Sequence, residues 1–173
     1  AAYAFMIGHP GKKLLFMGQD FAQLREWSEE RELDWFLLAE QPHQQIQNWV
    51  QELLHLYRKN KALYEMDTDE KGFEWINKDD IFRSIFSFVR YSKDRKRNLL
   101  FVCNFTPMER EDYRVGVPRG KQYKLILNSD DERYGGTGGE RPLMYKAVKK
   151  ECDGQKYSFA YPLPPYGVAV FEF

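Results

Sequence analysis

The stretch Lys12–Phe21 contains an apolar run, Leu14–Met17, that is closed by Gly18 and followed by the polar pair Gln19 and Asp20. An unbroken apolar run of this kind is typical of a strand that is buried on both faces, as in parallel sheets. Such a strand needs neighbours, yet no comparable run precedes it. The run therefore predicts a piece of a larger α/β fold, in which ligands bind beyond the carboxyl ends of the strands.

A long amphipathic helix is predicted over residues 42–60. Pro42 suits the first position of a helix. Apolar residues then recur at the 3.6-residue spacing of one helix face; they are Ile46, Trp49, Val50, Leu53, Leu54 and Tyr57. Ala1–Ile7 is short and apolar and could be the end of another helix. One strand and one helix cannot form a domain alone, so we interpret them as the last strand–helix unit of an α/β fold.

The pattern changes after residue 66 to that of an all-β domain. Short apolar segments alternate with turn residues, which is typical of an antiparallel sandwich. The predicted strands are Phe73–Asn77, Ile81–Tyr91, Leu99–Phe105, Tyr113–Val117, Tyr123–Leu127, Tyr145–Lys149, Tyr157–Tyr161 and Val168–Phe173. The chain is therefore predicted to be mainly β, with residues 1–66 and 67–173 as two units.

The charge balance excludes some classes of partner. Lys+Arg and Asp+Glu each number 26, so the formal net charge is zero. A neutral chain is a poor candidate for binding nucleic acid or an anionic membrane. No stretch approaches the roughly 20 apolar residues that span a bilayer, and no signal peptide is visible. These features favour a cytoplasmic protein.

The cysteines and histidines do not predict a metal site. The two cysteines, Cys103 and Cys152, lack metal-ligand spacing and are too few for a disulfide framework. Cys103 lies in an apolar run and is predicted to be a buried free thiol. His9, His43 and His55 are not clustered with other ligands, so a loop or a solvated helix face accounts for them.

Two residues near the apolar run are candidate site residues. Asp20 could be a carboxylate at the mouth of an α/β site, or a turn carboxylate that caps the next segment. Trp27 lies among charged residues and could be a platform for stacking a sugar, or a packing residue. Sequence alone leaves both pairs of alternatives open.

Two further segments have less specific patterns. The charged run Lys93–Arg97 suits a solvated hairpin tip better than a binding patch. The glycine-rich segment Tyr134–Gly139 follows neither the Rossmann nor the P-loop pattern, and it is either a place of close backbone approach or simply flexible. No spacing identifies a catalytic triad or the paired carboxylates of glycosyl chemistry.

Several motifs together resemble one family. Residues 8–23, GHPGKKLLFMGQDFAQ, followed by Trp27 and Leu33-Asp34-Trp35, resemble the eighth barrel strand and following loop of 1,4-α-glucan (glycogen) branching enzymes, in the α-amylase superfamily. Further similar segments are Tyr57-Arg58-Lys59, Lys61-Ala62-Leu63, Gly72–Trp75, Cys103–Pro107, Asp112-Tyr113-Arg114, Leu127–Asp130, Tyr134-Gly135-Gly136 and Leu163-Pro164-Pro165. The resemblance covers nearly the whole chain.

The resemblance implies the end of a (β/α)₈ barrel, with its last strand at Lys13–Met17 and its last helix at Pro42–Asn60. It also implies an amylase-type C-terminal β-sandwich from about residue 67. The family cleaves an α-1,4-glucan and transfers the cut chain to a 6-hydroxyl, by a retaining double displacement through a covalent intermediate. The resemblance implies no cofactor. The catalytic carboxylates would lie before Ala1, so no residue here is expected to be catalytic.

The resemblance suggests candidate glucan contacts at Asp20, Trp27 and Tyr134. Most family members have Glu where this chain has Asp20, which keeps the charge but shortens the side chain. Two other functions fit the same residues: a non-catalytic glucan-binding or scaffold module, and the tail of an amylase-type hydrolase or debranching enzyme. The expected partner is an α-glucan such as glycogen or amylose. The chain is also expected to bury Leu14–Met17, either by self-association through this segment or by folding it against the sandwich.

Overall fold

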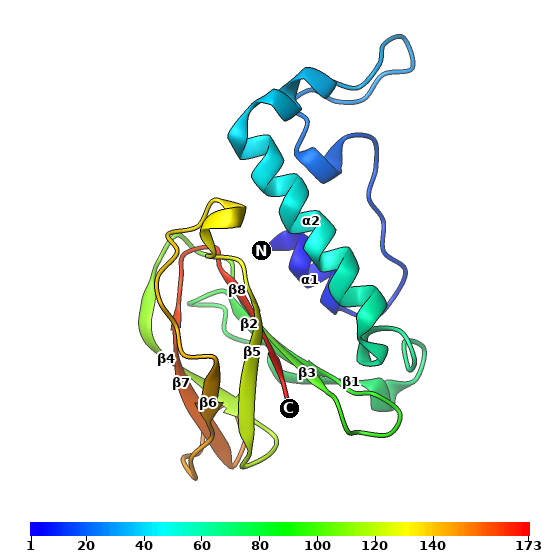
Figure 1. Ribbon diagram of the computed structural model, residues 1–173. Helices are drawn as coiled ribbons and strands as arrows, with labels where there is room; N and C mark the ends of the chain where they lie inside the picture. Colours follow the sequence, from blue (N-terminus) through cyan, green and yellow to red (C-terminus); the bar gives the residue numbers. More distant parts are fainter.

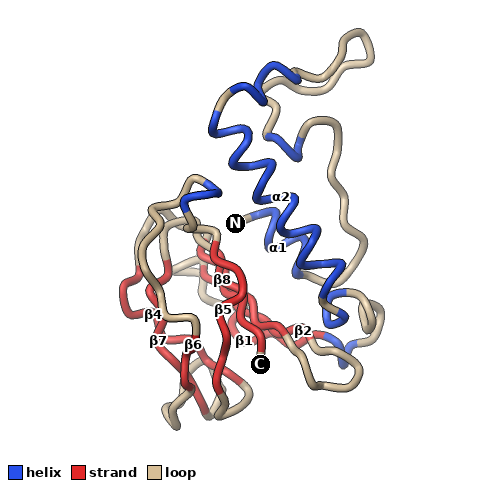
Figure 2. Tube along the Cα trace, viewed as in Figure 1, coloured by secondary structure: helices blue, strands red, loops and turns tan.

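The computed structural model describes all 173 residues and has three layers: helices, a large sheet and a small sheet (Figure 1). The helices are α1 (Ala2–Gly8) and α2 (Gln41–Lys59). The strands are β1 (Phe73–Asn77), β2 (Ile85–Arg90), β3 (Leu99–Asn104), β4 (Arg110–Val117), β5 (Gln122–Asn128), β6 (Met144–Lys146), β7 (Tyr157–Leu163) and β8 (Val168–Glu172). Short 3₁₀ turns occupy Gln19–Phe21, Trp35–Ala39, Lys61–Leu63, Glu70–Gly72 and Glu132–Tyr134. The strands gather on one side of the molecule and the two helices on the other (Figure 2).

The predicted antiparallel sandwich is confirmed. The large sheet has six strands in the order β1-β2-β3-β8-β5-β6, and β4 and β7 form a two-stranded sheet. Every pairing is antiparallel. Strand β3 is central and every residue in it is buried, as its apolar composition predicted.

The large sheet is buried on both faces because alternate residues of a strand point to opposite sides. Leu100 and Val102 of β3 contribute to the core between the two sheets. Phe101 and Cys103 contribute to a second core, under α1 and α2. The helix layer approaches closely at Gly8, where an added Cβ would lie 2.7 Å from the Phe101 ring. The helices therefore form an integral layer of this fold.

The predicted helix is confirmed as α2. It begins at Gln41, with Pro42 in its first turn, and ends at Lys59. Its buried face includes Trp49, Val50 and Leu53, as the periodicity predicted. Leu56 completes this face, whereas Leu54, which the predicted stripe included, is 39% exposed. The short helix predicted at Ala1–Ile7 is confirmed as α1.

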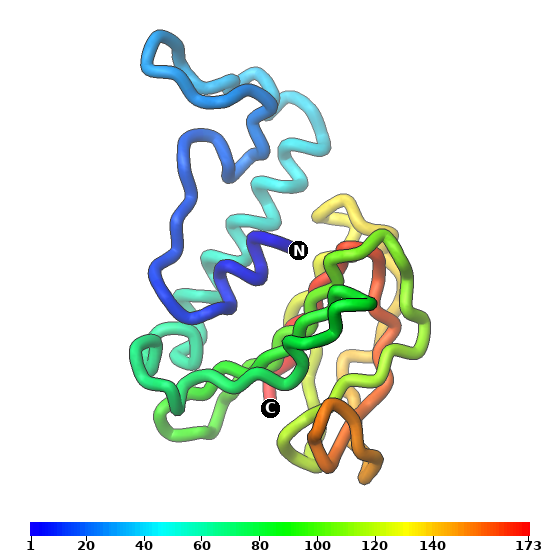
Figure 3. The backbone as a smooth tube through the Cα atoms, turned by 180° about the vertical axis from the view of Figure 1, so that it is seen from behind, coloured from blue at the N-terminus to red at the C-terminus, as the bar shows by residue number.

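The prediction of a strand at Lys13–Met17 is wrong. Residues 12–16 adopt no regular secondary structure, and Met17 and Gly18 form a turn. The segment runs as an open arch between α1 and the turn at Gln19–Phe21, away from the sheets (Figure 3). Its backbone takes part in one backbone hydrogen bond, from the Gln19 amide to the Phe16 carbonyl at 2.9 Å. A strand is stabilised by neighbours that pair with its amides and carbonyls, and none lies beside this segment.

Strand β2 begins at Ile85, four residues later than predicted. The preceding residues form a turn in which Asp80 accepts a hydrogen bond from the Arg83 amide at 3.2 Å. The Arg83 and Asp80 side chains also form an ion pair at 2.6 Å. Ser84 then has a positive φ of 48°, which a pleated strand does not allow. The exposed residues Ile81 and Phe82 therefore belong to a loop.

Candidate functional site

The loop that follows the arch encloses a pocket of about 340 Å³. We call it the loop pocket; it is lined by Phe16, Met17, Gly18, Gln19, Gln23, Leu24, Arg25, Glu26 and Trp27. Trp27 is 39% exposed, and its ring meets the Phe16 ring edge-on at 5.5 Å between centroids. A partly open indole beside a second aromatic ring and polar side chains is a suitable surface for stacking a sugar ring.

The loop pocket is held in shape by a buried carboxylate. Asp34 is 4% exposed and accepts two hydrogen bonds from the Arg25 guanidinium, one of them from Nε at 2.8 Å. Its backbone amide donates to the Gln23 side chain at 2.7 Å. Hydrogen bonding to Arg25 keeps the pKa of Asp34 below its ordinary value. Asp34 therefore remains charged at neutral pH and positions two residues of the pocket wall.

Asp20 lies beside the loop pocket but does not line it. It sits in the 3₁₀ turn after Gly18, whose φ of 82° is the left-handed conformation that favours glycine. The Tyr3 hydroxyl of α1 donates to the Gln19 carbonyl at 2.7 Å. Burial, and then the negative charge of Asp20, raises the pKa of Tyr3. The structure thus places Asp20 near Tyr3 of α1 and outside the lining of the loop pocket.

Tyr134 lies in a second pocket, about 300 Å³ in volume, where α2 meets the sandwich. We call it the junction pocket; it is lined by Ala1, Ile46, Trp49, Ser129, Asp130, Tyr134, Gly135, Gly136, Thr137, Pro165, Tyr166 and Gly167. The Tyr134 ring packs edge-on against Trp49 at 4.9 Å and is 9% exposed. Arg133 lies 4.6 Å from the ring centroid, over its π face. The ring is therefore too covered to serve as an open stacking platform.

The hydroxyl of Tyr134 is buried and has no hydrogen-bond partner in the chain. Burial raises the pKa of this hydroxyl to about 12, so it is protonated and can donate at neutral pH. An unpaired buried hydroxyl in a pocket wall is a favourable position for an oxygen of a bound molecule.

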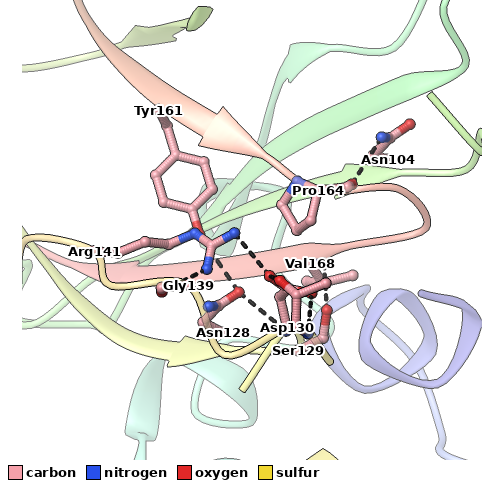
Figure 4. A network of polar contacts seen from close by, with 10 residues as sticks. Asn104, Asn128, Ser129, Asp130, Gly139, Arg141, Tyr161, Pro164 and Val168 are labelled. Carbon is pink, nitrogen blue, oxygen red and sulfur yellow. Dashed lines mark hydrogen bonds and ion pairs between the residues drawn. The ribbon is translucent and has the colours of Figure 1, made fainter. Parts of the chain in front are cut away.

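The wall of the junction pocket is built around Asp130 (Figure 4). Its carboxylate accepts hydrogen bonds from the Thr137 amide at 3.0 Å, the Thr137 hydroxyl at 2.6 Å and the Arg141 guanidinium at 2.9 Å. Burial alone would raise the pKa of Asp130, but these hydrogen bonds and the charge of Arg141 together lower it. The ion pair fixes both ends of the glycine-rich segment.

Sequence reasoning missed Trp49, Asp130 and Arg141 as site residues. Trp49 belonged to the apolar stripe of a helix, and nothing in its local pattern predicts contact with a loop more than 80 residues later. Asp130 and Arg141 lie before and after the glycine-rich segment Tyr134–Gly139. Opposite charges that flank such a loop were a signal that could have indicated a closed, ordered loop.

Other chemistry-bearing groups do not assemble into a site. No group of three or more His, Cys, Asp or Glu residues is arranged to hold a metal ion. Cys103 is buried, and burial raises the pKa of its thiol to about 12, so it is not nucleophilic. The helices of the structure include none that is long and apolar enough to cross a membrane.

Comparisons with known proteins agree with this architecture. Residues 75–173 match the family model described as the alpha amylase, C-terminal all-beta domain. The chain therefore belongs to this family of all-β domains. It is also similar along nearly all of its length to proteins named 1,4-alpha-glucan branching enzyme GlgB.

Three of these relatives illustrate the similarity. The protein of Butyrivibrio fibrisolvens is 56% identical over 171 residues, which cover 99% of this chain and 27% of that protein. The protein of Halothermothrix orenii is 43% identical over 98% of this chain and 27% of that protein. The protein of Aquifex aeolicus is 45% identical over 99% of this chain and 27% of that protein. The chain spans about a quarter of the length of these relatives, and the resemblance to branching enzymes is confirmed.

Proposed function

We propose that this chain is the C-terminal part of a 1,4-α-glucan branching enzyme. The observation that carries the proposal is the 56% identity over 99% of the chain to a protein of that name. The whole protein would cut an α-1,4-glucan and transfer the cut chain to a 6-hydroxyl in the cytoplasm, through a covalent glycosyl intermediate. Residues 1–66 would complete its catalytic barrel, and residues 67–173 would form its β-sandwich domain.

The chain itself would be non-catalytic. A retaining site needs two carboxyl groups about 5–5.5 Å apart in a cleft, one as nucleophile and one as acid and base. Neither pocket offers such a pair: Asp130 is the only carboxylate that lines the junction pocket, and Glu26 is the only one that lines the loop pocket. The role proposed for the chain is to complete the fold and to contact glucan.

Trp27 is the foremost candidate for glucan contact. It combines partial exposure with an aromatic neighbour, Phe16, and a pocket wall that contains the amides of Gln19 and Gln23. Asp20 is a candidate beside the same loop, where its carboxylate could accept a hydrogen bond from a sugar hydroxyl. Tyr134 is a candidate in the junction pocket, through its unpaired hydroxyl.

Co-sedimentation of the 173-residue chain with glycogen tests this proposal. Trp27→Ala is expected to weaken binding about fivefold, since an aromatic contact contributes roughly 1 kcal/mol. Phe36→Ala is the control, because Phe36 is also aromatic, is 67% exposed and lies outside both pockets. Equal binding by the two variants and the unsubstituted chain would refute the role of Trp27. Branching of amylose by the chain alone would refute its non-catalytic role.

We also propose that the chain self-associates through Leu14–Met17. Leu14 is 72% exposed, Phe16 48% and Met17 46%, and no strand pairs with this segment. Such a segment can pair with a second copy. Sedimentation velocity should show a concentration-dependent dimer that Leu14→Ser weakens and Ile81→Ser, at a site 79% exposed in the β1–β2 loop, does not. A monomer at all concentrations would contradict this.

A further inference from the structure

A third pocket lies at the C-terminal end of α2, where it faces the hairpin between β2 and β3. We call it the cationic pocket; it is lined by Lys59, Asn60, Lys61, Ser92, Asp94, Lys96 and Arg97. Its volume is about 300 Å³, and none of these residues is hydrophobic. Four of the lining residues carry positive charges, and one carries a negative charge. In the ribbon the helix end and the hairpin lie side by side (Figures 1 and 3).

Three of the four cations have no ion-pair partner. Arg97 donates from Nε to the Glu172 carboxylate at 2.8 Å, so its charge is largely balanced. No carboxylate lies within ion-pair distance of the ammonium groups of Lys59, Lys61 or Lys96; the ion pairs of the chain involve other residues. The only carboxylate in the pocket wall belongs to Asp94.

Asp94 is occupied in shaping the hairpin. It accepts hydrogen bonds from the Ser92 hydroxyl at 2.9 Å and from the Lys96 amide at 3.0 Å. Hydrogen bonding to the Lys96 amide and Ser92, and then the charges of Lys96 and Lys61, lower the pKa of Asp94. Lys61 and Lys96 come from segments far apart in the sequence, yet both line the same pocket as Lys59. The fold therefore brings three positively charged side chains to one pocket.

The hairpin is held firmly in position. The Lys93 amide donates to the Glu65 carboxylate at 3.0 Å, and the Asn98 side chain donates to the Arg95 carbonyl at 3.0 Å. Arg95 lies 3.9 Å over the Tyr91 ring and donates to the Lys71 carbonyl at 2.9 Å. The backbone that carries Lys96 is thus preorganised, and little ordering would be needed when a ligand binds.

Two simpler explanations account for only part of this arrangement. Cations in the last turn of a helix stabilise its dipole, which explains Lys59. It does not explain Lys96, which lies on the hairpin. A solvated hairpin tip explains Lys93, which does not line the pocket, but it gives no reason for Lys96 to line the same pocket as Lys59 and Lys61. Like charges that converge repel one another, and an anion between them would remove that repulsion.

We propose that the cationic pocket binds a phosphate group. Three ammonium groups supply several N–H donors in a small volume, which matches the oxygens of a dianion. The Asn60 side-chain amide donates to the Leu56 carbonyl at 2.8 Å, which leaves its carbonyl oxygen free to accept a hydroxyl of the molecule that carries the phosphate. Inorganic phosphate and a sugar phosphate share this chemistry. The inference does not depend on the proposed branching function.

An amide-resolved NMR titration of the 173-residue chain tests the proposal. Sodium phosphate and glucose 6-phosphate are titrated separately at slightly alkaline pH and constant ionic strength. Saturable shifts are expected at the amides of Asn60, Asp94 and Lys96. The double variant K59Q/K96Q should bind about tenfold more weakly, since hydrogen bonds to charged groups contribute that much.

The control is the double variant K149Q/K150Q, which removes the same net charge from two exposed lysines that do not line the cationic pocket. This control should bind as the unsubstituted chain does. Tighter binding of glucose 6-phosphate would assign a sugar phosphate, and equal binding would assign free phosphate; either result supports the site. Absence of saturable shifts, or equal weakening in the control, would overturn it. Near-ultraviolet circular dichroism establishes that each variant is folded.

Discussion

Single residues shape the junction pocket through their backbone geometry. A Cβ added at Gly136 would lie 2.2 Å from the backbone carbonyl carbon of Asp130. This close approach explains why the segment is glycine-rich, which sequence reasoning left open between close approach and flexibility. The composition of the segment was visible in the sequence, but its partner was not, because the approach depends on how the loop closes.

Gly136→Ala is expected to destabilise the chain by about 2 kcal/mol, because the backbone has to move to accept the methyl group. Gly139→Ala is the matched control in the same loop, since its Cβ would meet nothing closer than 3.5 Å. It should change the free energy of unfolding by less than about 0.5 kcal/mol. Urea unfolding measures both variants, and equal effects would contradict the assigned close approach.

The Asp130–Arg141 ion pair predicts a dependence of stability on pH. Since the folded-state pKa of Asp130 is lowered, its contribution is present above the unfolded-state pKa of about 3.9 and is lost as pH falls through the lower folded value. Asp130→Asn should therefore lower the melting temperature at neutral pH, and this difference should shrink below about pH 4. Asp112→Asn, at an exposed position, should show no such difference. A constant difference for Asp130→Asn down to acid pH would contradict this account.

At the scale of elements, a buried arginine joins the helix layer to the sheet. Arg90 of β2 is fully buried and donates to the Gly8 carbonyl at 2.7 Å, the Leu63 carbonyl at 3.1 Å and the Asp67 carboxylate at 2.8 Å. Gly8 ends α1, Leu63 ends the 3₁₀ turn after α2, and Asp67 precedes β1. One side chain thus holds three connections in place.

Arg90→Met is expected to destabilise the chain by about 3 kcal/mol, because it removes one partner of a buried ion pair and leaves two buried carbonyls unpaired. Arg97→Met is the control: Arg97 pairs with Glu172 on the surface, and its loss should cost less than about 1 kcal/mol. Chemical denaturation compares the two. A similar small cost for both would show that Arg90 does not join the layers.

The elements also show which predictions sequence supports. The helix at residues 41–59 was predictable because its apolar stripe is a local pattern, and the strands β3 and β8 were predictable because all but their last residues are apolar. The strand predicted at Lys13–Met17 does not form, because an apolar run becomes a strand only when neighbouring strands pair with it. The two pockets depend on contacts between distant segments, such as Trp49 with Tyr134, and no local pattern contains them.

At the scale of the whole molecule, the six-stranded sheet contributes to two hydrophobic cores, one on each of its faces. One core joins it to the small sheet, and the other joins it to α1 and α2. The helix segment and the sandwich are therefore packed into one structure, and both are covered by the similarity to branching enzymes. This arrangement is compatible with the role proposed above, in which the chain completes the fold of a branching enzyme.

The measurement that tests this central claim most directly uses the whole protein that contains this chain, incubated with linear amylose. Proton NMR then counts α-1,6 linkages and reducing ends in the product. We expect α-1,6 linkages to form while the number of reducing ends stays constant, because each cut chain is transferred to a 6-hydroxyl. A rise in reducing ends without α-1,6 linkages would show a hydrolase and contradict the proposed function.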